Sequence, residues 1–188
     1  MNLPNRLTCY RILLAVVFMF LLFSPGLLMK SFAIGAFLLA SLTDYWDGRI
    51  ARQTNQITRF GKLMDPVADK ILTLSAFMAF VEMKIIPAWM VVVIIARDLL
   101  ITGLRFLMPA EGVSQAAHAS GKHKTVLGFL AILAILVFIA LKETAFWKAV
   151  WTPPALVFIY WGMLVVVAVT LSSGVLYLIR NKDIFSKS

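Results

Sequence analysis

Four aspartates lie close together in the sequence, beside two long apolar stretches: Asp44, Asp47, Asp65 and Asp69. They are four of only nine acidic residues in a chain of 188. Carboxylate oxygens are hard ligands of the kind that Mg²⁺ and Mn²⁺ prefer. Two such ions about 3.5–4 Å apart can stabilise both the attacking and the leaving oxygen of a phosphoryl transfer. These residue types therefore predict a metal site of a kind that can catalyse phosphoryl transfer.

An ion-pair cluster is the alternative interpretation of these carboxylates. Five basic residues in or beside the same stretch can neutralise them: Arg49, Arg52, Arg59, Lys62 and Lys70. A single charge in the middle of a bilayer costs roughly 2.5–3.5 kcal/mol, and less near the interface. Because four inward-facing carboxylates also repel one another, they need a strong positive partner. This requirement favours metal ions over ordinary interfacial ion pairs.

The spacing of the aspartates matches one helical face in each half of the acidic stretch. Residues three and four apart share a face. Each face pairs two carboxylates with small residues: Asp44, Asp47, Gly48 and Ala51, then Gly61, Asp65, Ala68, Asp69 and Ala76. Two consecutive helices joined by a short polar link are antiparallel neighbours, so we expect the two faces to oppose each other. Pro66 predicts that the second helix begins near it, in the first turn, or bends there.

The composition predicts an integral membrane protein. Hydrophobic residues make up 61% of the chain, charged residues make up 14%, and the mean hydropathy is +0.90. Soluble domains are roughly 45–50% apolar and about 25% charged. Too few polar side chains remain to cover a water-soluble surface, and the length fits a single domain over residues 1–188. The net charge of +9 falls mostly in particular loops, which favours anionic lipid or phosphate over nucleic acid as a partner.

Apolar stretches and turn residues predict an all-α integral membrane fold with six transmembrane helices. A spanning helix needs about 20 mostly apolar residues. The predicted spans are Ile12–Met29, Phe32–Ala51, Asp65–Met83, Pro87–Met108, Val126–Leu141 and Pro154–Ile179. Gly121–Thr125 can extend the short fifth span as a polar first turn. Leu3, Leu7 and Tyr10 recur at helical spacing, which predicts a short N-terminal interfacial helix over Asn2–Tyr10.

The distribution of basic residues between loops predicts the orientation. Most Lys and Arg residues fall on one side of the predicted bundle, whereas the other side carries only Lys30, Lys84, Lys142 and Lys148. By the positive-inside rule, both termini and the four aspartates face the cytoplasm, in the cell membrane. A site in this position meets both a lipid headgroup and a soluble substrate.

The acidic stretch resembles the signature of the CDP-alcohol phosphatidyltransferase family. The pattern is Asp44-x-x-Asp47-Gly48-x-x-Ala51-Arg52, eight further residues, then Gly61-x-x-x-Asp65-x-x-x-Asp69, and every fixed position is filled. Three other patterns resemble the bacterial branch of the family that makes phosphatidylglycerophosphate: Asn5-x-x-Thr8-x-x-Arg11, Ala96-Arg97-x5-Gly103-x-Arg105 and Gly121-Lys122-x-Lys124-Thr125. The resemblance covers most of the chain.

The resemblance implies transfer of a phosphatidyl group from CDP-diacylglycerol to sn-glycerol 3-phosphate, with release of CMP. It implies two divalent ions, Mg²⁺ or Mn²⁺, on the four aspartates. It makes Asp69 the general base that takes the proton of the acceptor hydroxyl. It also implies a homodimer of six-helix chains among membrane lipids, with a site that opens toward the cytoplasmic leaflet.

The residues around the aspartates suit the donor of such a reaction. Gly48, Ala51 and Gly61 leave room for the nucleotide of CDP-diacylglycerol, and Arg52 can contact its phosphate. Thr8, together with Arg11, is interpreted either as the rim of this site or as an anchor for lipid headgroups. A metal-bound aspartate is a weak base, so proton transfer to it must accompany bond formation.

Basic residues farther along the chain form a candidate pocket for the phosphate of the acceptor. Arg97 lies near the middle of the predicted fourth span, a costly position for a charge. A local pair with Asp98 is the alternative, but adjacent helix residues point about 100° apart, so we expect Arg97 to face a cavity. Arg105 follows two turns later near the same face. Lys122 and Lys124 complete the pocket, and membrane anchoring is their alternative role.

Three other functions fit part of the pattern. Within the same family, the acceptor can be another alcohol, such as phosphatidylglycerol in cardiolipin synthesis or inositol phosphate. A divalent cation transporter also needs intramembrane carboxylates, but it predicts acidic groups spread across the bilayer and not gathered at one end. A non-catalytic lipid scaffold predicts that replacing Asp69 by Asn leaves function intact.

Overall fold

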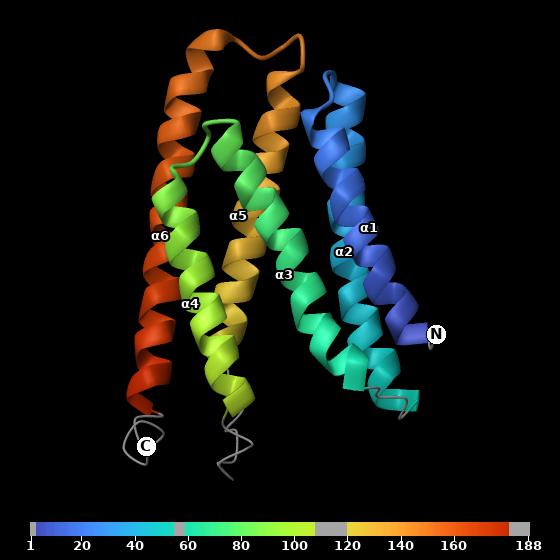
Figure 1. The fold of residues 1–188 in the computed structure, drawn as a ribbon. Helices are drawn as coiled ribbons and strands as arrows, with labels where there is room; N and C mark the ends of the chain where they lie inside the picture. Colours follow the sequence, from blue (N-terminus) through green and yellow to red (C-terminus); the bar gives the residue numbers. More distant parts are fainter. Residues whose placement is uncertain (1–2, 55–58, 108–119, 181–188) are drawn as a thin grey trace. The chain divides into compact units, whose positions relative to one another are not determined.

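The described part of the chain is helical in all of its regular secondary structure. The computed structural model describes residues 3–54, 59–107 and 120–180, with side chains over residues 10–43, 70–104 and 125–179. The helices in chain order are α1 (Leu3–Phe23), α2 (Leu27–Thr54), α3 (Arg59–Glu82), α4 (Ala88–Leu107), α5 (Ser120–Lys142), the short 3-10 helix η2 (Ala149–Trp151) and α6 (Thr152–Arg180), as Figure 1 shows. The prediction of an all-α fold is confirmed for these residues.

Two helical stretches of the described residues are long and apolar enough to cross a bilayer. They are Thr125–Lys142, with a mean hydropathy of 2.6, and Ala149–Ile179, with a mean hydropathy of 2.3. The second exposes large apolar side chains such as Phe158 and Trp161, which a water-soluble protein seldom gathers on one surface. Two further apolar helical stretches are shorter. These findings agree with a membrane protein, and the number of six spans stays a prediction.

The prediction that Asn2–Tyr10 forms a helix of its own is wrong, because α1 runs without a break from Leu3 to Phe23, and the interfacial location of this segment stays a prediction. Pro4 is the second residue of this helix. Proline is tolerated there because the N–H groups of the first turn have no acceptor within the helix. No glycine or further proline follows in α1. The segment before Tyr10 therefore extends the first apolar helix.

The first two helix boundaries differ from the predicted ones because of a turn at residues 24–26. The first helix ends at Phe23 and not at Met29, and the next begins at Leu27. Gly26 has a φ of 97°, a backbone conformation that is readily accessible only to glycine. The chain can therefore reverse direction within three residues.

The third and fifth helices both begin earlier than the predicted spans. α3 begins at Arg59, so Pro66 lies inside the helix and not in its first turn. The expectation of a first-turn proline is wrong, and Pro66 deprives α3 of one backbone hydrogen bond. α5 begins at Ser120, which confirms the expected polar extension of the fifth span.

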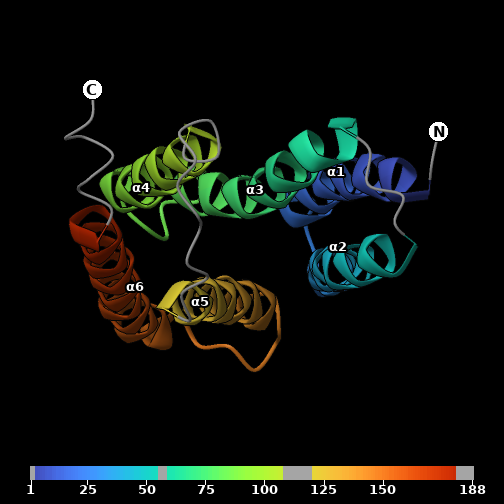
Figure 2. The same ribbon diagram turned by 90° about the horizontal axis from the view of Figure 1, so that it is seen from below.

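The helices group into two compact units, each of which is described by itself. Unit 1 comprises residues 1–82 and 132–151, and unit 2 comprises residues 83–131 and 152–188. In unit 1, α1 packs against both α2 and α3, whereas the contact between α2 and α3 is smaller (Figure 2). Alanines at the buried faces, such as Ala33, Ala40 and Ala76, let helix backbones approach closely. α1 is thus the shared neighbour that aligns the other two helices.

Lys30 closes the hairpin between α1 and α2. Its Nζ atom donates hydrogen bonds to the carbonyl oxygens of Leu22, at 2.6 Å, and Ser24, at 2.8 Å. The side chain is buried at the C-terminal end of α1, where the last carbonyls lack partners within the helix. A cation is favourable at this end of a helix. Lys30 therefore fixes how α2 returns along α1.

Unit 2 is built around the packing of α4 on α6. Met90, Val91 and Ile94 are buried on α4, and Met163 and Val166 are buried on α6. Ile94 follows Met90 by four residues and Val91 by three, and Val166 follows Met163 by three, as expected of one face on each helix. This face of α4 also carries Arg97, which is considered below.

We predict that Lys30→Met lowers the free energy of unfolding by about 1–3 kcal/mol, because two carbonyl oxygens lose their buried donor. The measurement is the thermal unfolding midpoint of the purified protein in detergent micelles. Lys84→Met is the matched control, since Lys84 is exposed. Equal midpoints for the two variants would contradict a capping role for Lys30.

Candidate active site

The two aspartate pairs lie at matching depths in α2 and α3. Asp47 is seven residues before the last residue of α2, and Asp65 is six residues after the first residue of α3. Asp44 and Asp69 are each ten residues from the same helix ends. At 1.5 Å per residue, Asp47 and Asp65 each lie roughly 10 Å from these helix ends, and Asp44 and Asp69 each lie roughly 15 Å from them. α2 and α3 run in opposite directions (Figure 1), so both pairs are counted from the ends that the acidic stretch connects, and the aspartate side chains lie outside the described residues.

Asp44 and Asp47 occupy positions that continue the buried face of α2. Ala33, Phe37 and Ala40 are almost fully buried, and they recur at alternating spacings of four and three residues. The next two positions of this series are 44 and 47. A repeat of this kind stays on one helical face with only a slow drift. Since the ring of Phe37 lies 5.6 Å from that of Phe18 on α1, this is the face that packs on α1.

Asp65 and Asp69 continue the buried face of α3 in the same way. Leu72, Ala76 and Ala79 are almost fully buried and are separated by four and three residues. Extending the series toward the start of α3 gives positions 69 and 65. Periodicity therefore predicts both aspartate pairs on the faces that form the interior of unit 1, and the orientation of these side chains stays a prediction.

The buried face of α1 ends in a charged residue. Leu22, Phe18 and Ala15 are buried at spacings of four and three residues, and the next member is Arg11, whose exposed fraction is 1%. Thr8 is the following position of the series, and its side chain lies outside the described residues. Arg11 therefore puts a positive charge on the buried face of α1, the helix that packs against both α2 and α3.

The burial of Arg11 bears on its two interpretations, the rim of the site and an anchor for lipid headgroups. A guanidinium removed from water is stable only with hydrogen bonds or a negative partner. An anchor for lipid headgroups would be exposed at the surface, whereas Arg11 is among the most buried large side chains of the described residues. This favours a role beside the aspartates over a role in headgroup anchoring.

The donor set on α2 and α3 fits divalent metal ions by its chemistry. It supplies four carboxylates, which are the ligands that hard cations prefer. Across residues 10–43, 70–104 and 125–179, no group of three His, Cys, Asp or Glu side chains forms an alternative metal site. The residues that would hold the ions are thus Asp44, Asp47, Asp65 and Asp69.

Arg97 lies in the buried face of α4 and reaches α6. Its side chain is 12% exposed. Nη2 donates a hydrogen bond to Oγ of Ser173 at 3.0 Å, and Nη1 donates to Oδ1 of Asp98 at 3.2 Å. The local ion pair weighed from the sequence therefore forms, but it engages only one nitrogen. Nε is buried and has no hydrogen-bond partner among the described residues, so Arg97 retains a donor beyond these two contacts.

The other predicted site residues lie on helices at positions whose side chains fall outside the described residues. Gly48, Ala51 and Arg52 belong to α2, Gly61 to α3, Arg105 to α4, and Lys122 and Lys124 to the first two turns of α5. Their helical context is established, and their roles stay predictions.

Sequence reasoning missed the two α6 residues that contact Arg97. Ser173 accepts its hydrogen bond, and a Cβ atom at Gly174 would lie only 2.9 Å from Cγ of Arg97. A signal for both was present, because Thr170, Ser172, Ser173 and Gly174 interrupt an otherwise apolar helix. Small and hydroxyl residues in such a helix mark close approach by a neighbour.

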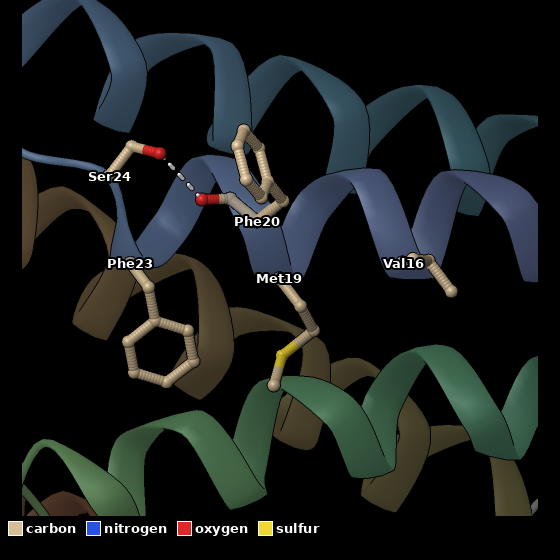
Figure 3. A pocket seen from close by; sticks show the side chains of 5 residues that line it. All are labelled: Val16, Met19, Phe20, Phe23 and Ser24. Carbon is tan, nitrogen blue, oxygen red and sulfur yellow. Dashed lines mark hydrogen bonds between the residues drawn. The ribbon is translucent and has the colours of Figure 1, made fainter.

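A hollow of about 490 Å³ lies along the half of α1 that is farther from the aspartates. It is lined by Val16, Met19, Phe20, Phe23 and Ser24 (Figure 3). The hydroxyl of Ser24 donates to the carbonyl oxygen of Phe20 at 2.8 Å. Because this lining contains neither acids nor bases, the hollow has no group suited to phosphoryl transfer.

Comparison with known proteins points to one family. Residues 1–178 match the family model described as CDP-alcohol phosphatidyltransferase. A Bacillus subtilis (strain 168) protein named CDP-diacylglycerol--glycerol-3-phosphate 3-phosphatidyltransferase is 40% identical over 147 residues, which cover 72% of this chain and 76% of that protein. Proteins of the same name from Rickettsia typhi and Escherichia coli (strain K12) are 37% and 35% identical, again covering 72% of this chain and 76% of each relative. The predicted family resemblance is confirmed.

We predict that Arg11→Met destabilises the protein by about 2–4 kcal/mol, because the groups that stabilise a guanidinium buried to this degree would lose their partner. The measurement is again the unfolding midpoint in detergent. Leu13→Met on the exposed side of the same helix is the control. An unchanged or raised midpoint for Arg11→Met would show that its charge is not balanced within the interior.

Proposed function

The chain belongs to the CDP-alcohol phosphatidyltransferase family, and we propose that it transfers a phosphatidyl group from CDP-diacylglycerol to sn-glycerol 3-phosphate. The products are phosphatidylglycerophosphate and CMP. The observation that carries the proposal is the continuation of buried faces on α1, α2 and α3 into Arg11 and the two aspartate pairs. The names of the relatives give the donor and the acceptor.

The four aspartates hold two divalent ions, Mg²⁺ or Mn²⁺, in this proposal. When bound, the ions supply positive charge that neutralises the pyrophosphate of the donor. Asp69 takes the proton from the acceptor hydroxyl as its oxygen bonds to phosphorus and the bond to CMP breaks. Arg11 balances part of the carboxylate charge from the neighbouring helix. Its burial supports this role.

The nucleotide of the donor lies against the small residues of the acidic stretch. Gly48, Ala51 and Gly61 leave space for it, and Arg52 contacts a phosphate through charge-assisted hydrogen bonds. Thr8 contributes to the rim of this site. The position of Thr8 on the same helical face as Arg11 supports that assignment.

The phosphate of the acceptor binds to basic residues. Arg97 supplies a guanidinium that offers several donors in a fixed plane, and its buried Nε supports this role. Arg105, Lys122 and Lys124 complete the cationic group. An acceptor without a phosphate would not need this group, which favours sn-glycerol 3-phosphate over uncharged alcohols.

We place the protein in the cell membrane as a single domain of six transmembrane helices, with the site and both termini facing the cytoplasm. The two described stretches that are long enough to span a bilayer support this location. The loop distribution of Lys and Arg supports the orientation. A homodimer is expected from the family resemblance.

Given a panel of acceptors with CDP-diacylglycerol, we predict that the purified protein releases CMP with sn-glycerol 3-phosphate, and that a chelator of divalent ions stops this release. Phosphatidylglycerol, inositol phosphate and water are the comparison acceptors. If CMP is released faster with phosphatidylglycerol or inositol phosphate than with sn-glycerol 3-phosphate, the proposed acceptor is wrong. Release that survives complete removal of divalent ions would overturn the metal chemistry.

Asp69→Asn is predicted to lower kcat at least about 100-fold, because a carboxamide cannot accept the proton. Binding of CDP-diacylglycerol should be largely retained. Glu143→Gln, an exposed carboxylate beyond the end of α5, is the control and should leave kcat unchanged. An unchanged kcat of Asp69→Asn would contradict its role as general base, absence of CMP release from the unaltered protein would support a scaffold, and metal flux into proteoliposomes without need of a lipid nucleotide would support a transporter.

A further inference from the structure

The hydroxyl proton of Ser173 is already used in a hydrogen bond within α6. Its hydroxyl donates to the carbonyl oxygen of Thr170 at 3.0 Å. The same oxygen accepts from Nη2 of Arg97 at 3.0 Å. Since a hydroxyl has one proton to give, the bond to Thr170 turns the lone pairs of Ser173 toward other donors. Ser173 is buried, so this oriented acceptor acts in an environment with little competing water.

Gly174 provides the space that the Arg97 side chain occupies. A Cβ atom built on Gly174 would lie 2.9 Å from Cγ, 3.2 Å from Nε and 3.7 Å from Cδ of Arg97. The first distance is shorter than real Cβ contacts allow. Cγ is near the root of the side chain, so a rotation at the far end of Arg97 cannot relieve the clash. Any larger residue at position 174 must therefore move Arg97 or separate α4 from α6.

From these two contacts we infer that Ser173 and Gly174 are positioning residues, which hold the guanidinium of Arg97 in the orientation that binds the phosphate of the acceptor. The inference rests on the proposed function, in which Arg97 contacts that phosphate. It adds α6 to the elements that determine acceptor affinity. Ser173 fixes the end of the guanidinium, Gly174 admits its stem, and Asp98 holds the other terminal nitrogen. Neither Ser173 nor Gly174 needs to touch a substrate.

Two residues of α6 offer matched controls. Ser172 makes the same kind of local bond, from its hydroxyl to the carbonyl oxygen of Val169 at 3.0 Å, but it is exposed. Gly162 lies in the same helix, and a Cβ atom there would meet nothing within 4 Å. Ser172→Ala and Gly162→Ala therefore repeat the chemical changes without the contact to Arg97.

The experiment measures kcat and the KM values of both substrates for purified variants. We expect Ser173→Ala and Gly174→Ala each to raise the KM for sn-glycerol 3-phosphate roughly tenfold, as loss of orientation of a charged hydrogen-bonding group implies. The KM for CDP-diacylglycerol should change less than about twofold. Ser173→Thr keeps the hydroxyl and should restore the acceptor KM to within about threefold of the original. Ser173→Ala adds no atom and so causes no clash, which means that it still tests the inference if Gly174→Ala fails to fold.

A double substitution separates positioning from general packing. In the Arg97→Ala background, Gly174→Ala should raise the acceptor KM no further, because the residue it displaces is absent. If Arg97→Ala itself leaves the acceptor KM unchanged, the assignment of Arg97 under the proposed function is wrong. If Arg97→Ala raises that KM but Ser173→Ala and Gly174→Ala behave like Ser172→Ala and Gly162→Ala, the positioning role alone is overturned. Equal rises in the KM of both substrates would also overturn it, since they indicate only a structural role.

Discussion

Charge at the end of an apolar interior is the constraint on which unit 1 depends. Three helices bury alanine, leucine and phenylalanine along their facing sides. Toward one end, the same series reaches Arg11 on α1 and aspartates on α2 and α3. Charged groups on such faces are tolerated only when they are balanced by opposite charge and by hydrogen bonds. Arg11 alone cannot balance four carboxylates, and the alternatives are the basic residues of the acidic stretch, such as Arg49 and Arg52, or divalent ions as in the proposed function. In the proposed function the ions take this part, because they also suit the chemistry of a pyrophosphate donor.

The position of α1 explains how this arrangement is held together. The helix contacts both α2 and α3, whereas those two helices contact each other less. Small residues on the facing sides permit close packing, which in a membrane replaces the hydrophobic effect as the source of helix association. At the other end, Lys30 ties the start of α2 to the end of α1 through two carbonyl oxygens. The arrangement of the two aspartate-bearing helices thus depends on a helix that carries none of the four aspartates.

Local patterns in the sequence predict the helices and the aspartate spacing, but they do not predict contacts between distant residues. The four-and-three repeat is visible in the sequence, and it correctly groups Asp44 with Asp47 and Asp65 with Asp69 by helix. α3 begins at Arg59, seven residues before Pro66, whereas a local argument would begin the helix at the proline. The continuity of α1 was missed because a change from polar to apolar residues does not itself end a helix. Ser173 and Gly174 are separated from Arg97 by more than 70 residues, so no local pattern connects them.

The most direct test of the account is the number of Mn²⁺ ions that the purified protein binds, measured by electron paramagnetic resonance during a titration. The account predicts two ions per chain with a spectrum of coupled spins, because the ions share one cluster of carboxylates. Asp65→Asn should reduce the number of bound ions or abolish the coupling. A protein that binds no Mn²⁺, or whose Asp65→Asn variant binds two coupled ions as before, would contradict the account.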